Sequence, residues 1–280
     1  MEAKYTIIQS FWTKPITDTI KLEHLLYIAA LSLTYAHRSG YKVNMHTDSQ
    51  GYDFLKDFGY DNLYKTLDEI PDTVPTELFA AGKFYAMKAE GIIGKIHTDF
   101  DVFIKKPHIL DSFYEDKNID LFVQQEEDYN NVCVPFFKDI LNSIYIFGYP
   151  STTRPSWQGS INVGTIGFNN VELANKYFDN YFLALKMYTK DKFEKYKETH
   201  KEYNLCFDFI LEQATLSYYS IGYNVHTMVP THNPNFVANE IGYQHLQGNS
   251  KWKTSSKMII KKLLENFNKE LYDKLQNMVI

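Results

Sequence analysis

The sequence predicts an α/β protein with a mixed, mostly parallel β-sheet flanked by helices in a single domain. Over the first hundred residues, short β-prone runs alternate with segments of helical period, the pattern of a parallel sheet covered by helices. The chain has 280 residues, which suits one large domain with a substantial core. It contains no internal repeat and no linker that would divide it cleanly.

Composition and charge limit the classes of function that this protein can have. Hydrophobic residues make up 44% and charged residues 22%, as in globular proteins, and the net charge of −5 argues against a general nucleic-acid binder. The two cysteines, Cys133 and Cys206, are far apart and lack metal-ligand spacing, which excludes a cysteine zinc site. The first residues lack a signal-peptide layout, and the longest apolar stretch, residues 25–33, is too short to span a bilayer. We expect a cytoplasmic protein without a transmembrane segment.

The first ninety residues predict three strands and three helices. Apolar side chains recur at helical spacing in the first helix, and Gly40 ends it. Thr76 is the expected N-cap of the third helix and Gly91 its C-cap. The expected strands are residues 5–9, 42–46 and 62–67, and the expected helices are residues 22–36, 53–58 and 76–90.

A fourth strand leads to two carboxylates. The β-prone run over residues 91–96 precedes Thr98-Asp99-Phe100-Asp101, and the run 102–104 leaves it. Open α/β sheets bind ligands beyond the carboxyl ends of their strands, so Asp99 and Asp101 would lie at such an edge. Oxygen ligands there suit Mg²⁺ or Mn²⁺, which proteins usually hold with one or two carboxylates and substrate phosphates. A turn with two solvated aspartates is the alternative interpretation.

The second half is less regular. Residues 126–157 show no sustained period and carry many aromatic side chains, which makes residues 129–157 a candidate lid over a ligand site. Glycines interrupt the β segment 159–169, where another backbone or a ligand would come close. The remaining expectations are a strand at 120–124, helices at 171–188 and 202–219, a strand at 225–229 and a loop at 244–252.

The tail from Ser256 is amphipathic. One stripe carries its apolar side chains, namely Ile260, Leu264, Phe267, Leu271 and Leu275. Its lysines permit peripheral contact with a membrane surface, but we favour a helix packed on its own domain.

Three segments together resemble the GT-A fold glycosyltransferases. Ile96-His-Thr-Asp-Phe-Asp-Val-Phe-Ile104 is similar to their Asp-x-Asp segment, and Ser160-Ile-Asn-Val-Gly-Thr-Ile-Gly-Phe-Asn169 to the strand that follows it in glycogenin-type transferases. His245-Leu-Gln-Gly-Asn-Ser-Lys-Trp252 is similar to their late His-x-x-Gly-x-x-Lys segment, although the usual proline before the tryptophan is missing. The segments occur in the family's order but cover about a tenth of the chain. The sequence likewise resembles galactosyltransferase-type and related capsular or lipopolysaccharide sugar transferases.

The chemistry of such a transferase assigns roles to these residues. A divalent cation would neutralise the departing nucleoside diphosphate, with Asp101 as a direct ligand and Asp99 on the cation or on donor hydroxyls. His245 would complete the coordination through a neutral ring nitrogen, a ligand type that Mn²⁺ accepts better than Mg²⁺. Lys251 would contact a phosphate, and Gly248 would let the loop backbone approach it.

The resemblance also implies donor-binding and catalytic residues. It places basic donor contacts on the helix before the Asp-x-Asp strand, where we favour Lys83, and the nucleotide base near Gln9 and Trp12. Asn162 would bind donor or acceptor hydroxyls, as would Gln158. Glu212-Gln213 resembles the acidic–Gln pair near the reacting sugar carbon, with a structural polar pair as the alternative.

We therefore expect a metal-dependent hexosyltransferase that uses Mn²⁺ or Mg²⁺. It would move a sugar from a nucleotide-sugar donor to a glycan or glycolipid acceptor. We expect a UDP-linked donor in preference to a GDP-linked one. The resemblance implies retention of configuration. Residues 1–253 would form the catalytic domain, with a donor half at about 1–125 and an acceptor half at about 126–253, and residues 254–280 a C-terminal amphipathic helix. The alternatives are a non-catalytic carbohydrate-binding protein of the same fold and, less favoured, a haloacid-dehalogenase-type phosphotransferase, whose late acidic pair the sequence lacks.

Overall fold

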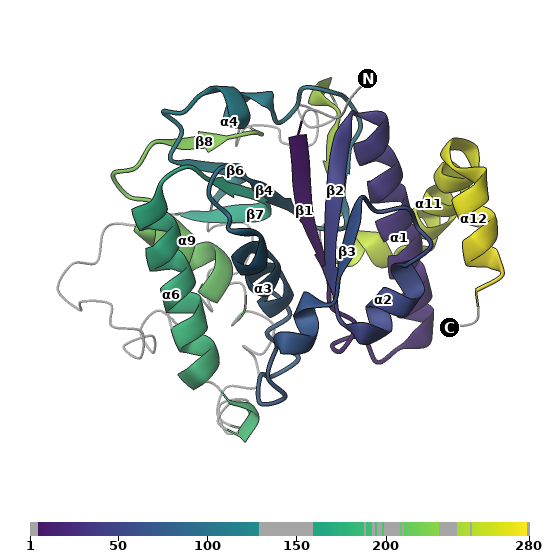
Figure 1. Cartoon of the computed structure of the whole chain (residues 1–280), viewed down its shortest axis with the longest axis horizontal. Helices are drawn as coiled ribbons and strands as arrows, with labels where there is room; N and C mark the ends of the chain where they lie inside the picture. Colours follow the sequence, from purple (N-terminus) through teal and green to yellow (C-terminus); the bar gives the residue numbers. More distant parts are fainter. Residues whose placement is uncertain are drawn as a thin grey trace.

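The fold is seen in a computed structural model, which describes residues 5–128, 159–187, 189–191, 194, 198, 208, 210–229, 240–246 and 248–278 (Figure 1). The candidate acceptor lid at 129–157, Gln158 and the first part of the expected 202–219 helix lie outside the described residues.

A seven-stranded sheet organises the chain, and its strand order is β3-β2-β1-β4-β7-β6-β8. The first four strands are parallel to one another, β7 is antiparallel to both of its neighbours, and β6 and β8 are parallel. This confirms the predicted mixed, mostly parallel sheet. The strands are β1 Tyr5–Phe11, β2 Tyr41–Thr47, β3 Asn62–Tyr64, β4 Ile96–Thr98, β6 Leu121–Asp128, β7 Gly159–Phe168 and β8 Val225–Thr227.

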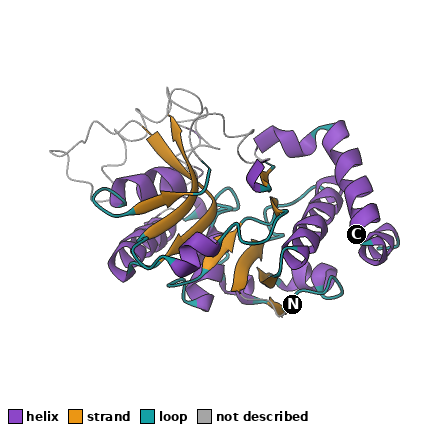
Figure 2. Ribbon diagram, turned by 90° about the horizontal axis from the view of Figure 1, so that it is seen from above, coloured by secondary structure: helices purple, strands orange, loops and turns teal. Residues whose placement is uncertain are grey.

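Helices cover both faces of the sheet, since successive strand residues point to opposite sides. Ile8 of β1 packs into a core with the helices α3 and α6, whereas its neighbour Ile7 packs into a second core with α1. Figures 1 and 2 show the two layers on either side of the strands. The first layer contains η1 Thr66–Glu69, α3 Ala81–Glu90, α6 Val171–Met187, η4 Ile210–Ala214 and α9 Thr215–Tyr219, and the second contains α1 Thr19–Arg38, α2 Ser49–Leu55, α4 Asp111–Glu115, α11 Thr254–Phe267 and α12 Lys269–Gln276.

The C-terminal stripe packs on the protein itself. Ile260, Leu264, Leu271 and Leu275 are buried in the core that α1 shares. The tail forms two helices where we expected one, because Asn268 leaves helical geometry at φ −151° and its side chain accepts a hydrogen bond from Leu271 N, capping α12. Within the described residues, no helix is both long and apolar enough to cross a bilayer.

Local capping explains where the other elements differ from expectation. The helix α2 begins at Ser49 because Asp48 caps it, accepting from Gly51 N at 2.9 Å. The helix α3 begins at Ala81, so Thr76 is not its N-cap; the Ala80 N–H instead donates to the distant Asp208 carboxylate at 2.7 Å. Gly91 ends α3 with φ +65°, as predicted. The strand expected at 62–67 is shorter and continues into η1.

A second, two-stranded sheet joins segments far apart in sequence. The strand β5, Val102–Ile104, pairs antiparallel with β9, Tyr243–His245, whose last two residues lie in the segment 244–252 that was expected to be a loop. Val102 lies opposite His245, and Leu246 N donates to Asp101 O at 3.1 Å. This pairing places His245 beside the segment that carries the two aspartates.

Candidate functional site

The two aspartates lie in a tight turn between β4 and β5. The turn is fixed by Asp99 N, which donates to Gly164 O at 2.8 Å, and by Val102 N, which donates to Asp99 O at 3.0 Å. Because β4 ends at Thr98, both carboxylates lie beyond its carboxyl end, where ligands bind in open α/β sheets.

Asp99, Asp101 and His245 converge on one point. Their candidate ligand atoms all lie within 4.8 Å of one another, and among the described residues no other group of this kind was found. His245 Nε2 is 3.3 Å from Asp101 Oδ1 and 4.0 Å from Asp99 Oδ2. Two carboxylates and one imidazole nitrogen are a donor set that suits Mn²⁺, so the chemistry of the site fits the expected cation.

The side of the His245 ring that faces away from the aspartates contacts Gln124 of β6. The sequence patterns did not single out this residue. His245 Nδ1 is 2.8 Å from Gln124 Oε1, and the Tyr243 hydroxyl donates to the same oxygen at 2.8 Å. Gly164 makes room for this contact: a Cβ there would lie 2.5 Å from both His245 Nδ1 and Gln124 Oε1. The expected close approach at the glycine-interrupted β segment is therefore made by two side chains.

Lys251 reaches the same carboxylates from η5, Gly248–Trp252. Its ammonium group pairs with Asp101 Oδ2, so Asp101 lies between Lys251 and His245. Burial opposes ionisation of Asp101, but these two partners outweigh it and hold the pKa of the carboxyl well below its ordinary value. Asp101 is thus an anion at any physiological pH. Gly248 begins the same short helix.

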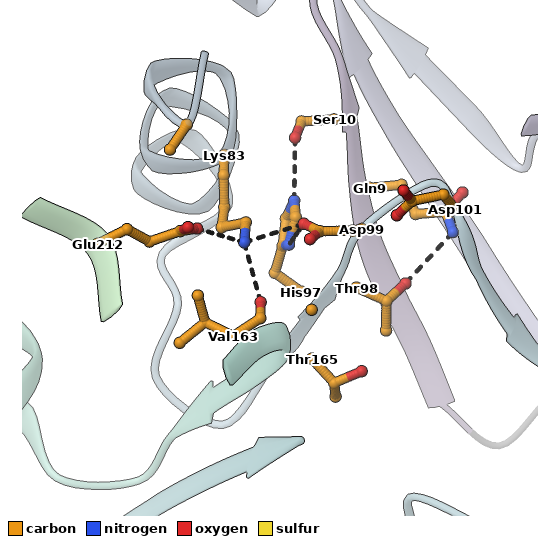
Figure 3. Close-up of polar contacts among 12 residues, drawn as sticks. Gln9, Ser10, Lys83, His97, Thr98, Asp99, Asp101, Val163, Thr165 and Glu212 are labelled. Carbon is orange, nitrogen blue, oxygen red and sulfur yellow. Dashed lines mark hydrogen bonds and ion pairs between the residues drawn. The ribbon is translucent and has the colours of Figure 1, made fainter. Parts of the chain in front are cut away.

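Lys83 joins the aspartate turn to a second buried carboxylate (Figure 3). Its Nζ lies 2.9 Å from Asp99 Oδ1, 2.5 Å from Glu212 Oε1 and 2.9 Å from Val163 O. Burial alone would lower the pKa of Lys83, yet Asp99 and Glu212 raise it above its ordinary value. Burial also raises the pKa of the Glu212 carboxyl, which Lys83 opposes.

Asp208, another residue that sequence reasoning missed, lies four positions before Glu212. It is buried, and it accepts hydrogen bonds from Ala80 N at 2.7 Å and from the Tyr181 hydroxyl at 3.0 Å. Burial and the neighbouring Glu212 raise the pKa of Asp208 to about 8. Because it lies on a segment far from α3 in sequence, no local pattern marks it as the residue that bonds the start of that helix.

The remaining predicted residues occupy different positions. Gln9 is fully buried on β1, where its amide donates to Ser32 Oγ at 2.9 Å. The same amide donates to Thr98 Oγ1 at 3.2 Å (Figure 3). Trp12 packs in the core against the start of α3. Asn162 is buried on β7 and accepts from Gly164 N at 3.0 Å, while Gln213 follows Glu212 and is half-buried. The structure thus brings together Lys83, Asp99, Asp101, Glu212, His245 and Lys251.

The chain was compared with known proteins. A model of the "Family of unknown function (DUF6734)" matches residues 5–278. Among curated proteins, no sequence matches.

Similar solved structures include three glycosyltransferases, the class that the motifs resemble. GlyE of Streptococcus pneumoniae TIGR4 is 12% identical with a TM-score of 0.43, covering 98% of this chain and 63% of GlyE. The galactosyltransferase LgtC, in complex with donor and acceptor sugar analogues, is 13% identical with a TM-score of 0.41, covering 98% and 97%. The bifunctional glycosyltransferase WbbM is 12% identical with a TM-score of 0.48, covering 98% and 52%. The chain therefore spans less than two thirds of GlyE and of WbbM.

Proposed function

We propose that this chain, which belongs to the family of unknown function DUF6734, is a metal-dependent glycosyltransferase that uses a nucleoside-diphosphate sugar. One observation carries the proposal: Asp99, Asp101 and His245, from two distant segments, place their ligand atoms within 4.8 Å of one another at the carboxyl edge of the sheet. Lys251, a cationic side chain suited to phosphate, contacts the same group.

The three ligands would hold Mn²⁺ in preference to Mg²⁺, because Mg²⁺ strongly prefers oxygen ligands. When bound, the cation supplies Lewis-acid stabilisation of the departing diphosphate. Asp101 provides the permanent negative charge for this binding, since its pKa is held well below the ordinary value. Asp99 is partly exposed, with 28% of its side chain accessible, so it can also accept hydrogen bonds from donor hydroxyls.

Lys251 would contact the β-phosphate as a fixed positive charge. Its pKa is raised by Asp101 against the opposing effect of burial, so it stays protonated throughout the physiological range. Negative charge developing on the leaving group would then face both Lys251 and the cation site. A preorganised charge stabilises the transition state without reorganisation at the moment of reaction.

Glu212 would lie beside the reacting sugar, because Lys83 holds it and Asp99 on one ammonium group. With its pKa raised by burial, Glu212 is suited to proton exchange with a sugar or acceptor hydroxyl. Gln213 and Asn162 would contribute hydrogen bonds to sugar hydroxyls. Gln9 and Trp12 remain our candidates for the nucleotide base region, although contact would require them to leave their buried positions.

The same proposal covers the organisation of the chain. Residues 1–253 would form the catalytic domain, with the donor half before about residue 125, and the two C-terminal helices would brace α1. We propose a UDP-linked donor in preference to a GDP-linked one, a glycan or glycolipid acceptor, retention of configuration and a cytoplasmic location.

A donor screen tests this function. Purified protein is mixed with UDP- and GDP-sugars, with and without Mn²⁺, and unfolding temperature and nucleotide release are measured. A donor at a hundredfold over its dissociation constant adds about 2.7 kcal/mol of stability. We expect Mn²⁺-dependent stabilisation by one donor and slow release of its nucleotide without acceptor, both lost in Asp101→Asn. Stabilisation without turnover in the presence of candidate acceptors would favour the carbohydrate-binding alternative, and no response to any donor with Mn²⁺ would refute the proposal.

A further inference from the structure

We propose that Gln124 is a positioning residue that fixes the ring tautomer of His245 and so prepares its Nε2 to bind the cation. This inference rests on the proposed function for the identity of the ligand. Gln124 lies on β6, is buried, and touches neither aspartate in any contact described above. It acts through His245 alone.

The hydrogen bonds determine the tautomer. The oxygen of an amide side chain only accepts, so the His245 Nδ1 atom at 2.8 Å must carry the hydrogen. A neutral imidazole has one N–H, which leaves the lone pair on Nε2. That atom is the one that faces the aspartates, 3.3 Å from Asp101 Oδ1. The opposite tautomer would place a hydrogen where the cation must bind.

The amide is itself oriented by a second donor. The Tyr243 hydroxyl donates to Gln124 Oε1 at 2.8 Å and is 3.1 Å from Thr165 Oγ1, which can donate to it. In this orientation of the amide, its oxygen accepts from both the Tyr243 hydroxyl and His245 Nδ1. The fixed orientation of Gln124 is thus built from β6, β7 and β9, three strands of the two sheets.

Partners of this kind change metal affinity measurably. Mutation of the group that receives the second N–H of a metal-binding histidine costs about 10- to 100-fold in metal affinity or activity. Gln124→Met keeps the length and burial of the side chain but removes the acceptor. Gln124→Glu keeps an acceptor at the same position and should rescue the effect.

The test measures binding of Mn²⁺ alone by electron paramagnetic resonance, without donor or acceptor. We expect Gln124→Met to weaken Mn²⁺ binding about 10- to 100-fold and Gln124→Glu to stay near wild type. The matched control is Asn180→Leu on α6, which removes a buried amide that accepts from the hydroxyl of Tyr219 on α9. It should reduce the unfolding temperature without changing Mn²⁺ affinity.

A long-range ¹H–¹⁵N spectrum of the Mg²⁺-loaded wild-type protein gives an independent readout that does not need a stable Gln124→Met variant. We expect a protonated Nδ1 and an unprotonated Nε2 at His245. A protonated Nε2, Mn²⁺ affinity unchanged in Gln124→Met, or Gln124→Glu as weak as Gln124→Met would each overturn the inference. Wild-type protein that binds no Mn²⁺ would instead refute the proposed function, which separates the two failures.

Discussion

Replacing Lys83 by Met should destabilise the protein and make its stability more sensitive to pH. The ammonium group contacts three oxygens at 2.5–2.9 Å, and the residue is 5% exposed. Removing one partner of a buried ion pair costs about 3–5 kcal/mol, because the other charge is left uncompensated. At about 2 °C per kcal/mol for a chain of this size, the unfolding temperature should fall by about 6–10 °C near pH 8.

The sign of the pH dependence follows from Glu212. Its pKa is raised in the folded protein, so its contribution to stability is present below the unfolded value of 4.5 and lost as pH rises through the folded value. Without Lys83 the folded pKa rises further, and the loss extends over a wider pH range. The deficit of Lys83→Met relative to wild type should therefore be larger at pH 8 than at pH 5.

Thermal unfolding of four proteins checks this reasoning: wild type, Lys83→Met, Glu212→Gln and the double variant. Since the residues share one ion pair, the double variant should be more stable than Lys83→Met and the two effects should not add. Additive losses, or a deficit that shrinks as pH rises, would show that the ammonium group does not compensate Glu212.

Three further outcomes are expected. Asp101→Asn should weaken Mn²⁺ binding by at least about 10-fold in calorimetry, since it removes the anion that lies between His245 and Lys251; unchanged affinity would place the cation elsewhere. In wild type, a carboxyl whose folded pKa is about 8 binds a proton between about pH 4 and pH 8, where the unfolded chain does not, so the unfolding temperature should decline over this range. Asp208→Asn should flatten that decline. A slope identical to that of wild type would contradict this. Gly164→Ala should displace the His245 ring, whose Nδ1 would lie 2.5 Å from the new Cβ, and so weaken Mn²⁺ binding about 10-fold. Binding as tight as in wild type would show that the position of the ring does not affect the affinity.

Local patterns predicted what local physics determines. The helix period around Leu26, the cap at Gly91 and the carboxylates after β4 each depend on neighbouring residues. The strands β1 and β2 lie where their β-prone runs are, whereas β4 begins only at Ile96, the last residue of the run 91–96, and β3 covers only the first half of the run 62–67. The sheet therefore follows from the alternation of strands with helices along the chain and from the burial of apolar strand residues. The grouping of Asp99, Asp101 and His245 required a further clue, the resemblance of three segments to one family.

Side chains that act across long sequence separations could not be predicted in this way. Gln124 belongs to a run of two glutamines in a strand, and only the fold shows that one of them receives the His245 ring. Asp208 bonds the start of a helix 128 positions away, so Thr76 was the reasonable but incorrect choice of N-cap. The strand β9 has no partner nearby in sequence, and two of its residues, Gln244 and His245, were therefore expected to be part of a loop.

The pairing of β5 with β9 also sets the order in which the polypeptide can mature during synthesis. Asp101 leaves the ribosome long before residue 245, and at about 5–20 residues per second the intervening chain takes on the order of ten seconds to make. Until β9 arrives, the acidic turn has neither its imidazole nor Lys251. A nascent or C-terminally truncated chain can thus contain all seven strands of the main sheet and still lack the third ligand. Loss of cation binding would therefore report damage to residues 243–251 before the main sheet is affected.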